Sequence, residues 1–373
     1  MASHYTDNGV LFLRSTNIEP FNIKMDDVKY ISPEFNETIK KSQLNPDDVV
    51  IVRTGKPGAC TVIPQKTEPW NCSDLVIIHP NKEKINPHFL ASYINLASGV
   101  INAHLVGAVQ QHFNVGAAKK MKIPLPSIDV QNRIASIIQG LNDKIELNNK
   151  INENLERQAQ SIYHERFETI NKDELPVGWR VVALGDVAII SKKSFNPSKE
   201  PETMLEHYSI PAFDESHFPV FELSTAIKSN KFVVDDDCFM ISKLNPTMKR
   251  VWRPYCLTKN AVCSTEFIVY KAKDRTITDF LYSVIDSVSF SDFMCSHVTG
   301  STGSRQRTTP SDTLSFEFVL PSEDELNSFQ ALVSPMYAQV RINTIQNDKL
   351  KRLRDSLLPK LMSGEIDVED VNI

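Results

Sequence analysis

The stretch from residue 129 to residue 169 alternates apolar and polar residues with the period of an α-helix. The apolar positions form one narrow stripe, with Asn, Gln, Lys and Glu between them, and they are Val130, Ile134, Ile137, Ile138, Leu141, Ile145, Ile151, Leu155, Ala159 and Ile162. The pattern predicts a long amphipathic helix whose apolar side is a narrow seam.

The seam returns 195 residues further along the chain. Its second copy consists of Phe329, Leu332, Val333, Met336, Val340, Leu350 and Leu357. Two polar positions repeat as well, because Asn148 and Asn152 align with Asn343 and Asn347, and a polar residue in such a seam sets the register of the helices. Two unrelated core helices would not agree in this way, so we predict that the copies pair through Ile134, Leu141, Leu155, Ile162, Phe329, Met336, Leu350 and Leu357.

Helix-breaking residues coincide too, since Gly140 aligns with Pro335. Each copy is therefore expected to consist of a short lead-in helix, a kink and a longer helix. Leu155 and Leu350 occupy matched positions in the longer helices, and we expect both to be buried against the opposite helix.

Each seam is preceded by short strand patterns separated by Pro, Gly and Asn. In the first half we predict a helix at Pro87–Leu96 and strands at Val10–Leu13, Val49–Arg53, Cys60–Ile63, Leu75–His79 and Lys122–Pro126. In the second half we predict a helix at Ile277–Val288 and strands at Val181–Asp186, Tyr208–Ala212, Cys238–Ser242, Ala261–Ser264, Glu266–Tyr270 and Phe316–Pro321. The elements follow the same order in both halves, which indicates a tandem duplication.

The predicted fold class is α+β, with two β-rich domains in a tandem pseudo-two-fold repeat, separated by a pair of long antiparallel coiled-coil helices. We expect the first domain at residues 1–126, the first helix at 127–172, the second domain at 173–321, and the second helix with a C-terminal tail at 322–373. Residues 175–207 have no counterpart in the first half, so the first domain is expected to be shortened at its N-terminus. That would expose apolar surface and favour a partner or self-association.

Composition restricts the function classes. The chain of 373 residues has a net charge of −5, so it has no overall attraction for nucleic acid, and any DNA contact must come from local basic loops. The six cysteines form no CxxC pair, and we expect reduced, mostly buried thiols. The chain shows neither a signal-peptide pattern nor a long apolar run, which predicts a cytoplasmic protein without membrane contact.

Loop residues suited to reading DNA occur in both halves. Arg, Lys, Asn and Gln make paired hydrogen bonds to base edges. The first half offers Arg53, Thr54, Lys56, Gln110, Gln111, His112 and Asn114. The second half offers Lys243, Asn245, Lys249, Arg250, Arg253, Ser301, Arg305, Gln306 and Arg307. Any one of these side chains is equally well explained as a solvated loop residue, but the matched positions of the Gln- and Arg-bearing loops favour contacts with double-stranded DNA.

The sequence gives little support for an enzyme. The segment Arg53–Gly58 lacks the spacing and the Ser or Thr of a phosphate-binding loop. Asn245-Pro246 matches only half of an adenine-methyltransferase motif and is better explained as a turn. The acidic run Asp235–Asp237 is more typical of a solvated turn than of a metal site. We therefore predict a non-catalytic protein with no cofactor and no metal.

Four segments carry a resemblance to a known family. They are Leu175-Pro-Val-Gly-Trp179 with Leu184-Gly185; Ile123-Pro-Leu-Pro126 leading into Gln131, Ile134 and Ile137; Leu147-Asn148, Ile151, Leu155, Gln158-Ala159 and Ile162; and the closing run Leu357–Ile366. In order and duplication they resemble the DNA-specificity subunits of type I restriction–modification systems. The resemblance covers essentially the whole chain.

The resemblance implies two target-recognition domains that each read half of a bipartite DNA sequence. It also implies antiparallel helices, no catalytic activity in the chain alone, and docking of adenine methyltransferase (M) subunits and restriction/translocase (R) subunits. The shortened first domain departs from the family pattern. A different class stays open from the residues alone, namely a coiled-coil scaffold that joins protein partners without reading DNA sequence.

Overall fold

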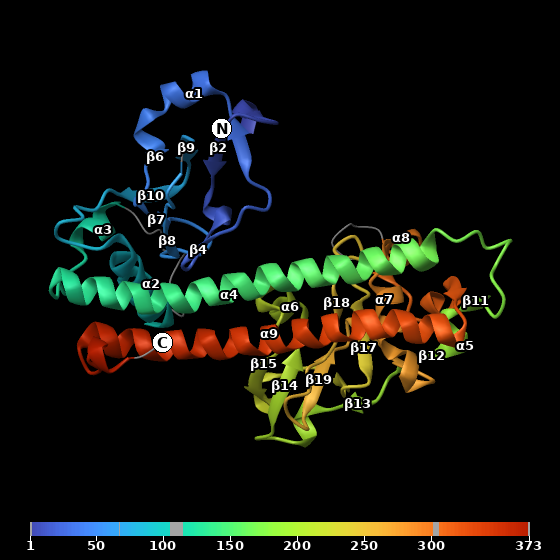
Figure 1. The fold of residues 1–373 in the computed structure, drawn as a ribbon. Helices are drawn as coiled ribbons and strands as arrows, with labels where there is room; N and C mark the ends of the chain where they lie inside the picture. The colour runs from blue at the N-terminus through green and yellow to red at the C-terminus, as the bar shows by residue number, and fades with distance from the viewer. Residues whose placement is uncertain (1, 67, 105–114, 301–305, 372–373) are drawn as a thin grey trace. The chain divides into compact units, whose positions relative to one another are not determined.

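The computed structural model describes residues 2–66, 68–104, 115–300 and 306–371. It is an α+β structure that divides into two compact units (Figure 1). The first unit is Met1–Glu146 with Lys349–Ile373, and the second is Leu147–Asp348. Two long helices, α4 (Ile128–Tyr163) and α9 (Glu323–Ser363), contribute one segment each to both units.

Local signals fix the ends of the two long helices. The Ser127 carbonyl accepts the Gln131 backbone N–H at the start of α4, as expected for a helix that begins after a serine. The first turn of α9 contains Glu323, Asp324 and Glu325. Their negative charges stabilise the helix start, because the N-terminal end of the helix dipole is positive. Gly364, at a φ of 74°, follows the last residue of α9, a conformation that glycine adopts without strain.

Neither long helix is interrupted at the position where the sequence predicts a kink between a lead-in helix and a longer helix. Helix α4 continues through Gly140, and α9 continues through Pro335. Glycine costs a helix about 1 kcal/mol, and an interior proline costs about 3 kcal/mol, because it removes a backbone hydrogen bond and its ring crowds the preceding turn. Packing of the apolar seam over ten turns offsets both costs, so that each seam belongs to one helix.

Within each unit, the α4 and α9 segments lie side by side and antiparallel (Figure 1). In the first unit, Ile134 and Ile138 share a core cluster with Leu358 and Leu361. Of the expected pairing residues, Ile134, Leu141 and Phe329 are buried, and Ile162, Met336, Leu350 and Leu357 are half-buried. Leu155 is half-buried as well.

Asparagines occupy the middle of the helix pair in the second unit. Asn148 donates to Asn347 Oδ1 at 2.8 Å and to Gln346 Oε1 at 2.9 Å. Asn343 donates to Asn152 Oδ1 at 2.9 Å. Asn148, Asn343 and Asn347 are each at most 4% exposed. The repeated polar positions thus pair with each other, and we call Asn148, Asn152, Asn343 and Asn347 the asparagine layer.

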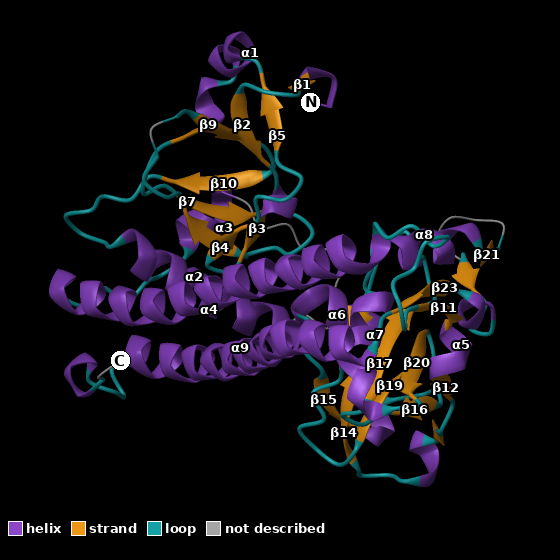
Figure 2. Cartoon of the chain, turned by 45° about the vertical axis from the view of Figure 1, so that its right-hand side comes forward, coloured by secondary structure: helices purple, strands orange, loops and turns teal. Residues whose placement is uncertain are grey.

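The β-rich part of the first unit contains small sheets and short helices (Figure 2). Among its described residues, one sheet has the order β1-β5-β2-β9-β6, another β10-β7-β8, and a third β3-β4. The strands are β1 (Tyr5–Thr6), β2 (Val10–Leu13), β3 (Ile18–Glu19), β4 (Asn22–Ile23), β5 (Lys29–Ile31), β6 (Gln43–Leu44), β7 (Val49–Val52), β8 (Cys60–Val62), β9 (Trp70–Cys72) and β10 (Leu75–Ile78). The helices are α1 (Pro33–Thr38), α2 (Pro87–His104) and α3 (Val115–Lys120).

The second unit repeats this plan with additions. Its described sheets have the orders β12-β20-β17-β18, β13-β16-β19-β14-β15, β11-β23 and β21-β22. The strands are β11 (Arg180–Ala183), β12 (Ala188–Ser191), β13 (Ser194–Phe195), β14 (Met204–Tyr208), β15 (Val220–Leu223), β16 (Lys231–Val233), β17 (Cys238–Ser242), β18 (Val251–Trp252), β19 (Ala261–Ser264), β20 (Phe267–Ala272), β21 (Val298–Thr299), β22 (Arg307–Thr308) and β23 (Glu317–Leu320). The helices are α5 (Leu184–Val187), α6 (Ile210–Ser216), α7 (Thr278–Ile285) and α8 (Val288–Ser296).

Strand register supports the duplication. In the first unit β2 pairs parallel with β9, and Leu13 lies opposite Cys72. In the second unit β14 pairs parallel with β19, and Tyr208 lies opposite Cys263. Each is the one parallel pair among the described strands of its unit, and each brings the last residue of an early strand beside a buried cysteine.

Two predicted strands are wrong, and a third, Val181–Asp186, is a strand only as far as Ala183, because helix α5 begins at Leu184. Residues 210–216 form helix α6 in place of the expected strand Tyr208–Ala212, and the strand β14 ends where that prediction began. Ser209 caps α6 by accepting the Ala212 N–H, and a proline lies in its first turn, both of which favour a helix. Residues 121–127, all described, form no strand, whereas their counterpart β23 is paired by β11.

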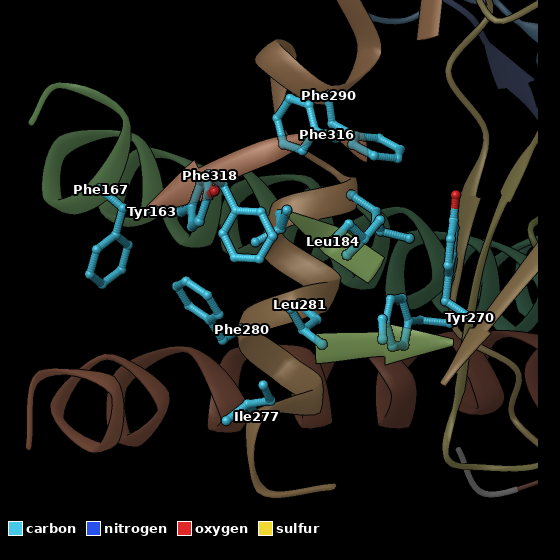
Figure 3. Packing of buried hydrophobic residues seen from close by; sticks show 14 of the residues in the cluster. Tyr163, Phe167, Leu184, Tyr270, Ile277, Phe280, Leu281, Phe290, Phe316 and Phe318 are labelled. Atoms are coloured by element: carbon cyan, nitrogen blue, oxygen red, sulfur yellow. The ribbon is translucent and has the colours of Figure 1, made fainter. Parts of the chain in front are cut away.

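The largest core lies in the second unit, where the end of α4 meets α7, α9 and β23 (Figure 3). Tyr163, Phe167, Phe280 and Phe329 pack with ring centroids 5.1–6.3 Å apart. Such aromatic contacts add to simple burial. They hold the β-rich domain of this unit firmly on its own segments of the two long helices.

Candidate nucleic-acid interface

Two basic residues occupy equivalent places in the two units. Arg53 follows β7, and its backbone N–H donates to the Asp74 carbonyl at 3.3 Å. Lys243 follows β17, and its backbone N–H donates to the Glu266 carbonyl at 2.9 Å. Each acceptor lies in the turn before the adjacent strand, β10 or β20. Neither basic side chain has an ion pair among the described residues, and the Arg53 side chain is exposed.

In the second unit the structure brings the two predicted loops together. The β17–β18 loop, residues 243–250, meets the segment that leads into β22. Asn245 donates its backbone N–H to the Gln306 carbonyl at 3.0 Å, and the Thr308 N–H donates to the Lys243 carbonyl at 3.1 Å. The side chains of Lys243, Asn245, Gln306 and Arg307 therefore come from neighbouring backbone segments.

Glu266 holds Arg307 in a fixed orientation. The guanidinium donates from Nε at 3.0 Å and from Nη2 at 3.1 Å to the two carboxylate oxygens. This bidentate bond raises the pKa of Arg307 above its usual value. The Glu266 side chain thus lies beside the same two loops. The sequence did not identify it as a site residue, because only basic and amide side chains were expected to contact DNA.

Three other cations that the sequence predicts to contact DNA form ion pairs with carboxylates of the same unit. Arg250 is 6% exposed and makes a bidentate ion pair with Asp214. Lys249 pairs with Asp286 at 2.7 Å. Burial raises the pKa of Asp286, and the Lys249 ammonium opposes that shift. These cations fix the loop to the domain, and we interpret the buried Arg250 as a structural residue rather than as the DNA contact that the sequence predicts.

Arg253 lies away from the β17–β18 loop. It follows β18, at the opposite end of that strand from the loop, and it pairs with Asp279. It lines a polar cavity of about 190 Å³ together with Asp237, Arg275 and Gln330. The sequence placed Arg253 with Lys249 and Arg250 because strand β18 is only two residues long and was not predicted.

The tip of the β17–β18 loop combines an unusual backbone conformation with two exposed side chains. Asn245 adopts a φ of 47°, which asparagine tolerates better than most residues. Its Oδ1 is buried and accepts no hydrogen bond from the described residues. Thr247 is exposed, and Met248 is 55% exposed. Met248 was not among the predicted site residues, because no sequence signal separates an exposed methionine from a core one.

The equivalent β7–β8 loop of the first unit is built differently. Gly55 and Gly58 have φ angles near 90°, which glycine adopts without strain. Thr54 is half-buried, and Lys56 lies 3.9 Å from Glu19. The remaining predicted contacts lie outside the described residues, and they are Gln110, Gln111, His112, Asn114, Ser301 and Arg305.

Other chemistry is sparse in the part of the chain that the structure describes. No cluster of His, Cys, Asp or Glu there could hold a metal ion. No helix in the same ranges is both long and apolar enough to cross a membrane. The six cysteines are free thiols, of which Cys60, Cys72, Cys238 and Cys263 are buried.

Comparisons with known proteins define first the class of domain. A family model described as the type I restriction modification DNA specificity domain matches residues 8–157, which include the β-rich domain of the first unit and most of α4. A crystal structure of a type I restriction–modification S subunit from M. genitalium has the same fold, with a TM-score of 0.56 at 14% identity, over 97% of this chain and 91% of that one.

Curated relatives then name the proteins to which a larger part of the chain is similar. The specificity subunit of the type I restriction enzyme MjaIX of Methanocaldococcus jannaschii is 27% identical over 68% of this chain. The alignment spans 62% of that relative's length. The HindI specificity subunit of Haemophilus influenzae is 22% identical over 78% of this chain and 80% of its own. This chain is thus similar in sequence to type I restriction enzyme specificity subunits, and its residues 8–157 match the model of their DNA specificity domain.

Proposed function

We propose that this chain is a sequence-specific DNA-binding subunit that reads a bipartite duplex target. Residues 1–126 would read one half-site and residues 173–321 the other. The observation that carries the proposal is the equivalence of Arg53 and Lys243, which emerge from matched strands and are held by matched backbone bonds. Two copies of one reading surface suit two half-sites.

The residues available to contact DNA are those that no strong ion pair holds within the protein. A chain with a net charge of −5 can approach a phosphate backbone only where local cations face solvent. In the second unit, Lys243 and Gln306 offer an ammonium and an amide beside Arg307, and amides and guanidinium groups are the best readers of base edges. In the first unit Arg53, Thr54 and Lys56 lie on the equivalent loop.

The same proposal makes the chain non-catalytic and assigns it partners. As a specificity subunit it would act within a type I complex, and adenine methyltransferase and restriction/translocase subunits would supply the chemistry. Leu147, Ile151 and Ile342, on the helix segments of the second unit, are 37–57% exposed and offer an apolar surface for such a partner. The DNA that it would read places it in the cytoplasm.

A selection experiment tests the proposal. The full chain, with and without its cognate methyltransferase, is incubated with a pool of random duplexes in moderate salt, and the bound fraction is sequenced. We expect two short sequence blocks separated by a fixed spacer. K243A should weaken the preference in one block and R53A in the other, with losses of about tenfold or more, since one mismatched base pair costs about 1–3 kcal/mol. K199A, which removes an exposed lysine elsewhere in the second unit, is the matched control.

The main alternative is a coiled-coil scaffold that joins proteins without reading DNA. It predicts that the same selection enriches no sequence while the chain still copurifies with a partner. Enrichment of a single contiguous block would instead contradict the assignment of one half-site to each domain.

A further inference from the structure

Arg250 connects the tip of the β17–β18 loop to helix α6. Its Nε and Nη2 donate to the two carboxylate oxygens of Asp214, at 2.6 Å and 2.9 Å. Its Nη1 donates to the Met248 carbonyl at 3.4 Å, and Nη2 lies 3.5 Å from the Met248 sulfur. Because the guanidinium is a rigid fork, these contacts fix the backbone and side chain of Met248 together.

Helix α6 is itself a fixed reference. Phe213, next to Asp214, packs edge-on against Trp252 at 5.3 Å between ring centroids, and Trp252 packs against the buried Tyr208 at 4.8 Å. The cap Ser209 fixes where the helix begins. The position of Asp214 is therefore set by the domain core and not by the loop that it holds.

A second ion pair holds the same loop from the other side. Lys249 donates to the Asp286 carbonyl at 2.7 Å as well as to its carboxylate. The loop backbone also closes on itself, because the Ser242 N–H donates to the Arg250 carbonyl at 2.9 Å. Consecutive cations thus clamp the base of the loop, and Thr247 and Met248 stay exposed at its tip.

Among the described residues of the first unit, no arginine–carboxylate pair takes the place of Arg250 and Asp214. Ala59 precedes β8 where Arg250 precedes β18, and the β7–β8 loop contains Gly55 and Gly58. The first domain therefore serves as an internal control for any effect of the clamp, within the same molecule.

We propose that Arg250 and Asp214 are positioning residues for reading the second half-site, and that they act through Met248. The pair does not touch DNA but sets where the loop tip stands against the base edges. Met248 then supplies an apolar contact, of the kind that a thymine methyl group accepts. This inference rests on the proposed function.

The test compares variants of the full chain in the random-duplex selection. D214N removes the acceptor but keeps the volume, R250M removes the donor, and R250K keeps the charge without the fork. M248A removes the apolar tip. D279N breaks the Arg253 ion pair at the far end of β18 and is the matched control.

We expect D214N, R250M and R250K each to reduce the preference in the second block by about tenfold at the affected base pairs, the scale of a lost base contact. The first block, and the affinity for unrelated duplex, should change less than about twofold. M248A should reduce the sequence preference only at those base pairs of the second block where thymine is preferred. Melting temperatures measured in parallel identify variants that fail to fold, and R250K, the mildest change, keeps the proposal falsifiable in that case.

D214N separates positioning from direct contact. If Arg250 itself touched DNA, removing the neighbouring carboxylate would strengthen binding or leave it unchanged, because a negative charge near phosphate is lost. A D214N chain with an intact second block therefore overturns the proposal. If the unmodified chain enriches no sequence at all, the proposed function fails, and that outcome is distinct from the first.

Discussion

At the residue scale, one buried acid, Glu206, organises a loop of the second unit. Glu206 is fully buried in β14, and both of its carboxylate oxygens accept hydrogen bonds. The donors are the Tyr208 hydroxyl and, at 2.7 Å, the Thr258 backbone N–H. The Tyr208 oxygen in turn accepts from the Tyr255 N–H at 2.6 Å. One carboxylate thus shapes the chain between residues 254 and 260.

Replacing this carboxylate with an amide gives a prediction at the same scale. E206Q keeps the shape of the side chain but turns one acceptor into a donor that faces another donor. We expect a loss of about 2–3 kcal/mol in the free energy of unfolding, measured in urea, because bonds to a charged acceptor are worth about 1.5–3 kcal/mol. E215Q, on the exposed side of α6, should change stability by less than about 0.5 kcal/mol. Equal stability of the two variants would show that Glu206 is dispensable.

The features that could not be predicted from the sequence are mostly contacts between individual residues. The predicted cations were identified by type, but their acidic partners Asp214, Asp279 and Asp286 come from remote elements. An ion pair between residues that are far apart in the sequence leaves no local pattern. Lys249, Arg250 and Arg253 were for that reason grouped with Lys243, although only Lys243 lacks a carboxylate partner among the described residues.

At the element scale, hydrophobic periodicity predicted the long helices, whose pattern repeats over many turns, but it did not predict the shortest strands. The seams of α4 and α9 were recognised because apolar residues at helical spacing extend over many turns. The strands β2, β17 and β19 have the predicted ends, since each is a compact apolar run. The strand β18 has two residues and carries no such signal. Helix α6 was misassigned although its serine cap and early proline were visible in the sequence.

The asparagine layer gives a prediction at this scale. N148L leaves Asn347 Oδ1 and Gln346 Oε1 without their donor, and we expect it to cost about 1–3 kcal/mol in urea unfolding. The double variant N148L/N347L replaces both partners with apolar groups, and should recover most of that loss. We further expect the double variant to pair its helices less uniquely, which faster and less uniform hydrogen exchange across 147–163 and 323–348 would report. Additive losses in the double variant would show that the two asparagines act independently.

At the scale of the whole molecule, charge balance limits how the chain can hold DNA. With 41 basic and 46 acidic residues, attraction to phosphate comes from a few loops. We therefore expect the logarithm of the binding constant to fall with the logarithm of salt concentration at a slope shallower than about −5, since each phosphate contact contributes about −0.9. Fluorescence anisotropy over a salt series measures it. A much steeper slope would require a basic surface that the described residues do not supply.

The asparagine layer joins residues that lie 199 positions apart in the chain, as Asn148 and Asn347 do. During synthesis, at about 5–20 residues per second, α4 is complete roughly ten to forty seconds before its partner emerges. Throughout that interval Ile134 and Ile138 lack Leu358 and Leu361 of α9, although Phe89 of α2 is already made, and the apolar surface left uncovered would attract chaperones or other nascent chains. Asn148 and Asn152 interrupt the exposed apolar seam of α4 with amide groups that water can solvate. We therefore expect the layer that pairs the helices in the folded protein to limit aggregation of the nascent chain as well.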